Sequence, residues 1–343
     1  MIAALAIIAV AAGAAVFVSS TWETEARQES LDRTTSNFLS NLAPISTLDE
    51  VYTDANGDLL ADAPENLELC SKPAELAFSF IASDDSVNSP EIWRAVLDAL
   101  KTRTGLPVKY LRLEGTKEQL EALRHGALHV TAFGSGAVPV AVNTCGFTPV
   151  CTFGRADGSY GYKMQFIVKS DSDIKDPAAL RDKRIAFTRP NSNSGYKAAL
   201  VLLMQKYAML PERDYQWRFL YGHPEAIVAV ASGEADAAPI ASDIFAREVA
   251  KGAFQADDFR VIYESERFPP VAFGYAYNLT PELREAIREA LLELSWSGTK
   301  LEEEFGGDEA TKFVAISYKD DWANIRRVDE AAANAKERLV VAR

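Results

Sequence analysis

Thr188–Tyr196, with the sequence TRPNSNSGY, joins the apolar run Arg184–Phe187 to the longer apolar segment Lys197–Lys206. The first run predicts a β-strand and the second an α-helix. A strand that turns through Pro, Asn, Ser and Gly into a helix directs several unpaired backbone N–H groups at one point, beside side-chain hydroxyls and amides. Helix N-termini favour negative charge, so the segment is suited to bind a small oxyanion. Taken alone, it is equally consistent with an ordinary N-cap loop.

Strands and helices alternate on both sides of this segment. Upstream, we predict β-α-β-α-β with elements at 76–82, 91–101, 108–113, 116–125 and 128–133. Downstream, we predict elements at 164–169, 176–182, 184–187, 197–206, 217–220, 225–231 and 236–240. Such alternation predicts an α/β fold with mostly parallel sheets that are flanked by helices.

A weak internal repeat divides these elements into two lobes. Leu123–Thr131 and Val230–Ala238 both predict the end of a helix, a glycine stop and a strand. Each strand ends in a small polar loop, either Gly134–Gly136 or Ala241–Asp243. Ligands of open α/β sheets bind at the carboxyl ends of strands, so we expect the two loops to face a shared cleft.

Five segments follow from this division. We expect a signal or membrane-anchor segment, an acidic lead segment, a first lobe, a second lobe, and a return to the first lobe with C-terminal helices. Their ranges are 1–19, 20–74, 75–165, 166–270 and 271–343. The first eighteen residues are almost continuously apolar, which is typical of a signal-peptide core or an uncleaved membrane anchor. Both predict a periplasmic or other extracytoplasmic location.

Composition and motifs argue against several classes of function. The net charge is −13, and the sequence has no basic patch with interleaved aromatic residues, which argues against nucleic-acid binding. No P-loop, GxSxG, HExxH or strand-linked GxGxxG motif occurs, and spacing suggests no Ser/His/Asp triad. The chain has three histidines, and Gly126 prevents His125 and His129 from sharing a helix face. We therefore expect no catalytic residue, no metal and no cofactor.

Two features leave alternatives open. Cys145 and Cys151 bracket a short Gly/Pro loop, and they form either a small disulfide or two buried thiols. Asp54–Asp62 carries oxygen side chains at a spacing that resembles a calcium loop, but Leu59 occupies the position where an EF-hand has glycine. This difference at Leu59 favours an acidic turn without a metal over a calcium loop.

Side chains near the predicted cleft have both a functional and a structural interpretation. His223 follows a second-lobe strand, and its imidazole is able to donate to an oxyanion or to lie at the surface. Arg189 is placed either to help bind a phosphate or to point into solvent. We expect Tyr160 and Tyr162 to serve packing or to lie beside the hinge.

One set of motifs identifies a family. PNSNSGY at 190–196 precedes a helix, with SDI at 172–174 and LRDKR at 180–184 ahead of it, and GH at 222–223 and VASGEADAA at 230–238 after it. Residues 75–295 thereby resemble the phosphate, phosphite and phosphonate substrate-binding proteins of ABC importers, the phosphonate-binding-protein family. The resemblance implies a two-lobed, type II periplasmic-binding-protein fold with the ligand between the lobes.

The resemblance also implies the residues of the site. In the family a Ser-Thr-Ser turn and a later His hold the phosphonate oxygens. In this chain the matching positions are Ser192, Asn193, Ser194 and His223, with Gly195 following the turn.

The chain departs from the family pattern in ways that bear on the ligand. Asn193 stands where the family has Thr, so an amide replaces a hydroxyl donor. Asp243 falls near the carboxylate that holds the ligand amine in aminophosphonate binders, and Ser135 replaces the aromatic residue usual in the first-lobe loop. Asp84 or Asp85 lies where the first strand meets the cleft, and either accepts a proton from the ligand or caps the next helix.

We therefore predict a solute-binding protein that captures a phosphonate, phosphite or phosphate for an ABC importer permease. Neutral donors and helix dipoles are expected to bind the anion without surrounding Lys or Arg, and the lobes are expected to close over it. One alternative is a membrane-tethered sensory or regulatory module of the same fold. The other is an enzyme of phosphorus metabolism, which the lack of an activated nucleophile disfavours.

Overall fold

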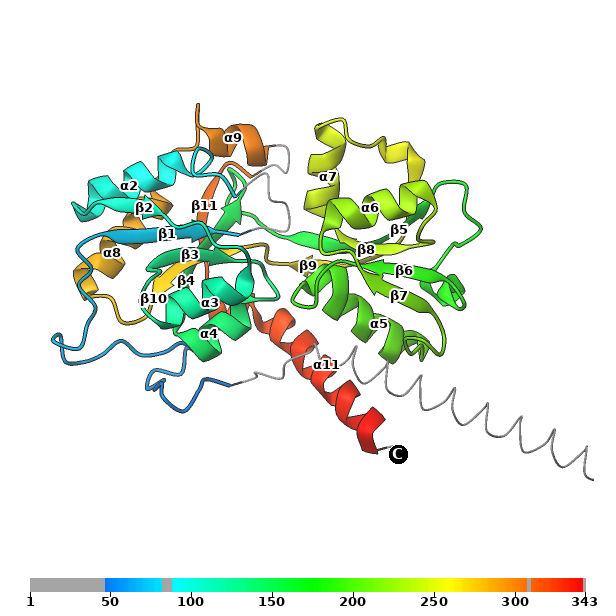
Figure 1. The fold of residues 1–343 in the computed structure, drawn as a ribbon, viewed down its shortest axis with the longest axis horizontal. Coiled ribbons are helices and arrows are strands. Elements are labelled where there is room, and N and C mark those ends of the chain that lie inside the picture. The colour runs from blue at the N-terminus through cyan, green and yellow to red at the C-terminus, as the bar shows by residue number, and fades with distance from the viewer. Residues whose placement is uncertain (1–46, 82–87, 307–309, 342–343) are drawn as a thin grey trace, which may run out of the picture.

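The computed structural model describes residues 47–81, 88–306 and 310–341. Two lobes lie side by side, and each is built on a β-sheet flanked by helices (Figure 1). The predicted segment 1–19, the first part of the acidic lead segment and Asp84 lie outside the described residues. Within the described ranges, no helix is both long enough and apolar enough to cross a membrane.

A six-stranded mixed sheet forms the first lobe. Its strand order is β11-β4-β10-β3-β1-β2. The strands are β1 (Leu76–Phe80), β2 (Val108–Tyr110), β3 (Val130–Phe133), β4 (Phe147–Gly154), β10 (Ala272–Ala276) and β11 (Lys312–Ala315). β1 pairs in parallel with β2 and β3, whereas β10 runs antiparallel to both β3 and β4. β10, which follows the second-lobe strands in sequence, lies between β3 and β4 in this sheet.

Helices and aromatic side chains complete the first lobe. The helices are α2 (Arg94–Thr104), α3 (Thr116–Arg124), α4 (Val138–Cys145), α8 (Pro281–Leu292), α9 (Lys300–Phe305) and α10 (Tyr318–Asp321). In the core, the rings of Phe80 and Trp93 lie 4.1 Å apart and those of Phe153 and Phe305 lie 4.7 Å apart, measured between centroids. Burying each such ring contributes about 1.5–3 kcal/mol to folding.

The second lobe carries the segment predicted to bind an oxyanion, Thr188–Tyr196, hereafter the anion turn. Its strands are β5 (Tyr162–Lys169), β6 (Arg184–Phe187), β7 (Gln216–Phe219), β8 (Ala238–Ala241) and β9 (Phe259–Phe268). β5 lies between β8 and β9 in antiparallel pairing, β6 pairs in parallel with β7, and a bridge from Ile185 to Ala237 joins the two groups. The helices are α5 (Ala198–Tyr207), α6 (His223–Ser232) and α7 (Ser242–Ala250), and a π-helical turn, Asn193–Lys197, leads into α5.

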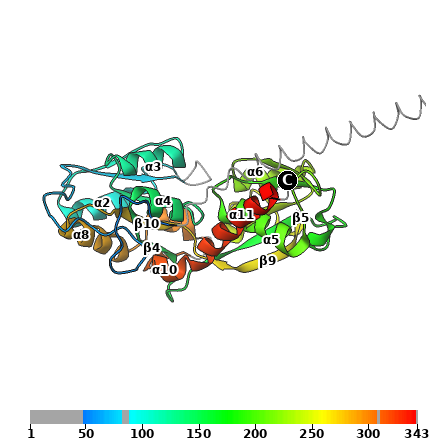
Figure 2. The ribbon, with the colours of Figure 1, turned by 90° about the horizontal axis from the view of Figure 1, so that it is seen from below.

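Three segments connect the lobes. Residues 155–161 lead from β4 to β5, and residues 269–271 lead back from β9 to β10. The third connection is α11 (Ala323–Val341), which leaves the first lobe after α10 and lies along α5 of the second lobe (Figures 1 and 2).

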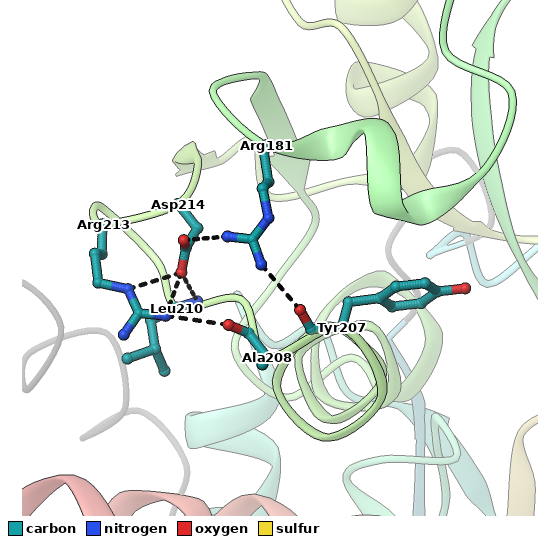
Figure 3. Close-up of polar contacts among 6 residues, drawn as sticks. All are labelled: Arg181, Tyr207, Ala208, Leu210, Arg213 and Asp214. Carbon is teal, nitrogen blue, oxygen red and sulfur yellow. Dashed lines mark hydrogen bonds and ion pairs between the residues drawn. The ribbon is translucent and has the colours of Figure 1, made fainter.

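A network of charged side chains lies at the C-terminal end of α5, and the anion turn lies at the other end of this helix. Ala208 adopts a left-handed conformation with φ of 52°, and Asp214 accepts hydrogen bonds from Arg181, from Arg213 and from the Leu210 N–H (Figure 3). The two arginines also donate to the carbonyls of Tyr207 and Ala208, at 3.2 Å and 3.1 Å. These contacts satisfy carbonyls that the helix end leaves without helical partners. They fix the orientation of the helix whose other end forms the site.

The predicted α/β class and two-lobed arrangement are confirmed, but the sheets are mixed instead of mostly parallel, because the strands at which the chain crosses between the lobes, β4, β5, β9 and β10, pair antiparallel. The prediction of a loop between Cys145 and Cys151 is wrong. Cys145 ends α4, Gly146 turns the chain with φ of 63°, and β4 begins directly afterwards. Both thiols are free and buried, so the second of the two alternatives is the one found.

The acidic lead segment forms a turn at Asp54–Asp62, and Lys319 of α10 donates to its Gly57 carbonyl at 2.8 Å. The Asp54 carboxylate accepts from the N–H groups of Asp58 and Leu59, both at 3.0 Å. The Asp62 carboxylate accepts from the Ala55 N–H at 2.8 Å. No group of three or more His, Cys, Asp or Glu side chains suited to a metal occurs in the described part of the chain. The structure agrees with an acidic turn.

Candidate functional site

The anion turn is built by the entry into α5. The Ser192 hydroxyl caps this helix by accepting a hydrogen bond from the Gly195 N–H at 3.0 Å. Main-chain helical bonding begins with the Lys197 N–H, which donates to the Ser192 carbonyl at 3.1 Å. The N–H groups of Asn193 and Ser194 therefore come before the first helical bond and lie at the positive end of the helix dipole.

Gly195 lies behind the turn. A Cβ at this position would come within 1.9 Å of the Thr188 hydroxyl, so only glycine allows the helix to begin so close to the end of β6. Gly195 does not belong to the residues that line the neighbouring cavity. Its place in the structure is that of a packing residue, which brings Asn193 and Ser194 to the cavity wall.

A cavity of about 160 Å³ lies between the lobes at the anion turn. Side chains from both lobes line it. The residues predicted from sequence that line it are Ser135, Ser192, Asn193, Ser194, His223 and Asp243. Residues from four separate segments of the chain thus meet at one cavity.

His223 presents a fixed tautomer to this cavity. It is the first residue of α6, and its Nδ1 accepts a hydrogen bond from the Ala241 N–H at 3.1 Å. Burial of the imidazole, with smaller contributions from the positive charges of Arg247 and Arg189, lowers the pKa of His223 to about 3. At neutral pH the ring is therefore uncharged and carries its proton on Nε2, which makes it a hydrogen-bond donor.

Tyr162 connects the two lobes inside the cavity. Its hydroxyl lies 2.8 Å from the Ser135 hydroxyl of the first lobe and 3.4 Å from the Asn193 Nδ2 of the anion turn. Burial raises the pKa of Tyr162, so the phenol stays protonated. Sequence reasoning gave this residue a packing or hinge-side place and missed its polar contacts. The available signal was a tyrosine directly after Gly161, at the point where the chain enters the second lobe.

Asn193 is buried at the back of the cavity. Only 2% of its surface is exposed, and its Oδ1 has no hydrogen-bond partner in the structure. The amide that replaces the family hydroxyl donates through its Nδ2 to the Tyr162 hydroxyl, so it connects the anion turn with β5.

Two arginines also line the cavity, which corrects the expectation of neutral donors alone. Arg247 lies one turn after Asp243 on α7, is only 7% exposed, and stacks over the Phe305 ring at 5.9 Å. Arg189 lies two residues after the end of β6 and donates to the Tyr221 carbonyl. Arg247 was not predicted from the sequence, although its i+4 spacing from Asp243 places both residues on one helix face.

Asp243 is the carboxylate among the described lining residues. Its Oδ1 accepts from the Ile244 N–H at 2.9 Å. Burial raises the pKa of this carboxyl, while the positive charge of Arg247 acts in the opposite direction. Two guanidinium groups and one carboxylate leave the cavity wall with a net positive charge when His223 is neutral.

Apolar side chains form another part of the cavity lining, beside the polar first-lobe residues Thr116, Gln119 and Ser135. This apolar part consists mainly of first-lobe side chains, with further apolar residues from the inter-lobe segment and α7. These residues are Phe80, Ile81, Phe133, Phe153, Phe305, Pro270, Val271 and Ile244. A ligand that matches both the polar and the apolar parts of the lining has an anionic head and a part without charge.

Comparisons with known proteins agree with this geometry. The family model of the periplasmic substrate-binding protein of phosphonate ABC transporters matches residues 78–322. The phosphonates-binding periplasmic protein of Escherichia coli (strain K12) is 22% identical over 216 residues, which are 62% of this chain and 64% of that protein. The alignment thus spans slightly less than two thirds of the length of that relative.

Two solved structures share the fold. The binding-protein component of an ABC phosphonate transporter from Pseudomonas aeruginosa superposes with a TM-score of 0.62 at 19% identity, covering 79% of this chain and 99% of that one. PhnD1 of Prochlorococcus marinus (MIT 9301), solved in complex with methylphosphonate, gives a TM-score of 0.64 at 15% identity, covering 76% and 98%. The type II periplasmic-binding-protein fold is thereby confirmed. Since the family model matches well over half of its residues, the chain belongs to the periplasmic substrate-binding proteins of phosphonate ABC transporters.

Proposed function

We propose that this protein captures a phosphonate in the cleft between its lobes and delivers it to the permease of an ABC importer, without catalysing a reaction. The observation that carries the proposal is the convergence of the anion turn with the neutral, donating imidazole of His223 at one cavity wall. Family membership supports the same assignment. Phosphite and phosphate, which share the oxyanion, are the competing ligands.

In this proposal the phosphonate oxygens accept hydrogen bonds from the second lobe. The donors are the hydroxyls of Ser192 and Ser194, the N–H groups at the start of the helix, and His223 Nε2. Charge-assisted bonds of this kind are roughly twice as strong as neutral ones. Arg189 and Arg247 offset the ligand charge.

The first-lobe wall favours a phosphonate over phosphate. A phosphonate carries carbon on phosphorus, and the apolar side chains of the cavity lining offer a surface for that substituent. Phosphate would place a fourth polar oxygen against the same wall, where Ser135 and Tyr162 already bond to each other. Asp243 is the described carboxylate available to a ligand amine, although the charge of Arg247 competes for it.

We infer that the lobes, 75–165 with the return segment and 166–270, close on the ligand about residues 155–161 and 269–271. The closed form is then what the permease recognises. Family membership supports a periplasmic location. Whether residues 1–19 are cleaved or retained as an anchor decides between a diffusing carrier and the membrane-tethered module considered as the alternative.

Calorimetric titration with methylphosphonate, 2-aminoethylphosphonate, phosphite and phosphate tests the proposal. We expect a phosphonate to bind most tightly, and Ser192→Ala to weaken it about ten- to a hundredfold, because a hydrogen bond to a charged group is lost. The matched control is Ser232→Ala, which removes an exposed hydroxyl at the far end of α6. If none of the four ligands binds, or Ser192→Ala binds as the wild type does, the proposal fails.

A further inference from the structure

A buried lysine lies directly behind the anion turn. Lys197 is the last residue of the π-helical turn, and only 6% of its surface is exposed. Its ammonium donates to the Gly136 carbonyl at 2.8 Å and to the Asp329 carboxylate at 2.9 Å. The first acceptor belongs to the first-lobe loop and the second to α11. One side chain of the second lobe thus connects the anion turn with two elements that originate in the first lobe.

The first-lobe loop lies in direct contact with the anion turn. A Cβ on Gly136 would come within 2.3 Å of the Asn191 carbonyl oxygen and 2.8 Å of the Asn193 backbone nitrogen. The preceding carbonyl, that of Ser135, accepts from the Trp322 indole N–H at 3.0 Å. The carbonyls of Ser135 and Gly136 are therefore both used, the first by Trp322, just before α11, and the second by Lys197.

The helix α11 extends from the first lobe to the second and provides the second acceptor of Lys197. Trp322, just before α11, is fully buried in the first lobe, and the helix itself lies along α5 (Figure 2). Asp329, two turns later, is 17% exposed at its side chain and meets Lys197 there. Separation of the lobes would pull Lys197 away from Gly136 or α11 away from α5.

We propose that Lys197 is a positioning residue that holds the first-lobe loop and α11 on the anion turn, and so keeps the lobes together before any ligand arrives. A buried ammonium that loses one acceptor without replacement is strongly disfavoured, so each contact that closes the lobes also satisfies the lysine. In a pre-closed protein the ligand meets donors of both lobes already in place. The effect on affinity rests on the proposed function, whereas the effect on lobe separation does not.

The test measures the distance between the lobes without ligand. Spin labels at Asp98→Cys on α2 and Val228→Cys on α6 lie on exposed positions of the two lobes, and the three native thiols are buried. Double electron–electron resonance is then recorded for the wild-type background, Lys197→Met, Asp329→Asn and a control, Lys163→Met. The control removes an ion pair between Lys163 and Glu264, whose 2.7 Å contact lies within the second lobe.

We expect one short distance in the background and the control, and an added longer distance in Lys197→Met and Asp329→Asn. If Lys197→Met does not fold, Gly136→Ala serves instead, because its methyl group forces the loop off the turn and should also lengthen the distance. A folded Lys197→Met, or failing it Gly136→Ala, with the background distribution overturns the inference.

A second arm keeps the inference apart from the proposed function. Methylphosphonate is added to each variant, and Lys197→Met should regain the short distance only at about tenfold higher ligand concentration than the control, since part of the binding energy must close the lobes. If Lys197→Met regains it at the control's concentration, the positioning role in binding is overturned. If no variant responds to ligand while the ligand-free distances differ as expected, the proposed function fails and the inference stands.

Discussion

At the scale of single residues, His223 shows how burial sets chemistry. A histidine in water is half protonated near neutrality, whereas this one is buried beside two arginines and stays neutral. Its Nδ1 is occupied by a backbone N–H, so the remaining proton lies on Nε2 at the cavity wall. The imidazole is thus a donor whose protonation state does not change at physiological pH.

The lowered pKa of His223 predicts how the free energy of unfolding depends on pH. Because the pKa of His223 is about 3 in the folded chain and 6.5 in the reference state, the unfolded chain binds the proton more readily between these values. The contribution of His223 to the free energy of unfolding is therefore fully present above pH 6.5 and is lost as the pH falls toward 3. From pH 7 to pH 5 this group removes about 2 kcal/mol. Urea unfolding at both values should show that His223→Gln loses less stability than the wild type by that amount, and an equal loss would contradict it.

Some of the site residues were predictable from sequence, and others were not. Ser192 and Ser194 lie in a local motif whose chemistry follows from a strand turning into a helix. Tyr162 was not predictable, because its partners Ser135 and Asn193 are distant in the chain and meet only when the lobes pack. Asp84, also predicted, lies outside the described residues.

At the scale of elements, β4 shows why one strand was predicted as a loop. Residues 145–151 contain Gly146 and Pro149, which are typical of turns. Pro149 nevertheless lies inside the strand, opposite Gly274, where the register with β10 shifts. A Cβ on Gly274 would come within 2.0 Å of the Thr148 carbonyl oxygen, so the glycine on the neighbouring strand makes room for the irregular backbone. That compensation comes from a distant segment and leaves no local signal.

The end of α5 carries a prediction at the same scale. Asp214→Ala removes the acceptor of the Leu210 N–H and the carboxylate that holds Arg181 and Arg213 at the helix end. We expect a loss of about 2–3 kcal/mol in the free energy of unfolding, measured with urea. The control Asp171→Ala alters an exposed turn and should change stability by less than about 0.5 kcal/mol. Equal unfolding midpoints for the two variants would show that the network does not stabilise the helix end.

At the scale of the whole molecule, two lobes, two crossing segments and α11 place one cavity at the anion turn. The alternation of strands and helices and the repeated glycine stops predicted the two lobes. The course of α11 was not predictable, since an amphipathic C-terminal helix does not indicate which lobe it covers. Trp322 and Asp329 decide it through contacts with Ser135 and Lys197, which are more than a hundred residues earlier.

The most direct measurement is a crystal structure of the full chain grown with methylphosphonate. We expect the phosphorus atom in the cavity between the lobes, with ligand oxygens within hydrogen-bond distance of Ser192, Ser194 and His223 Nε2. The methyl group should lie against Phe80 and the neighbouring apolar side chains. A methylphosphonate bound elsewhere, or bound with its methyl group toward the anion turn, would contradict this expectation.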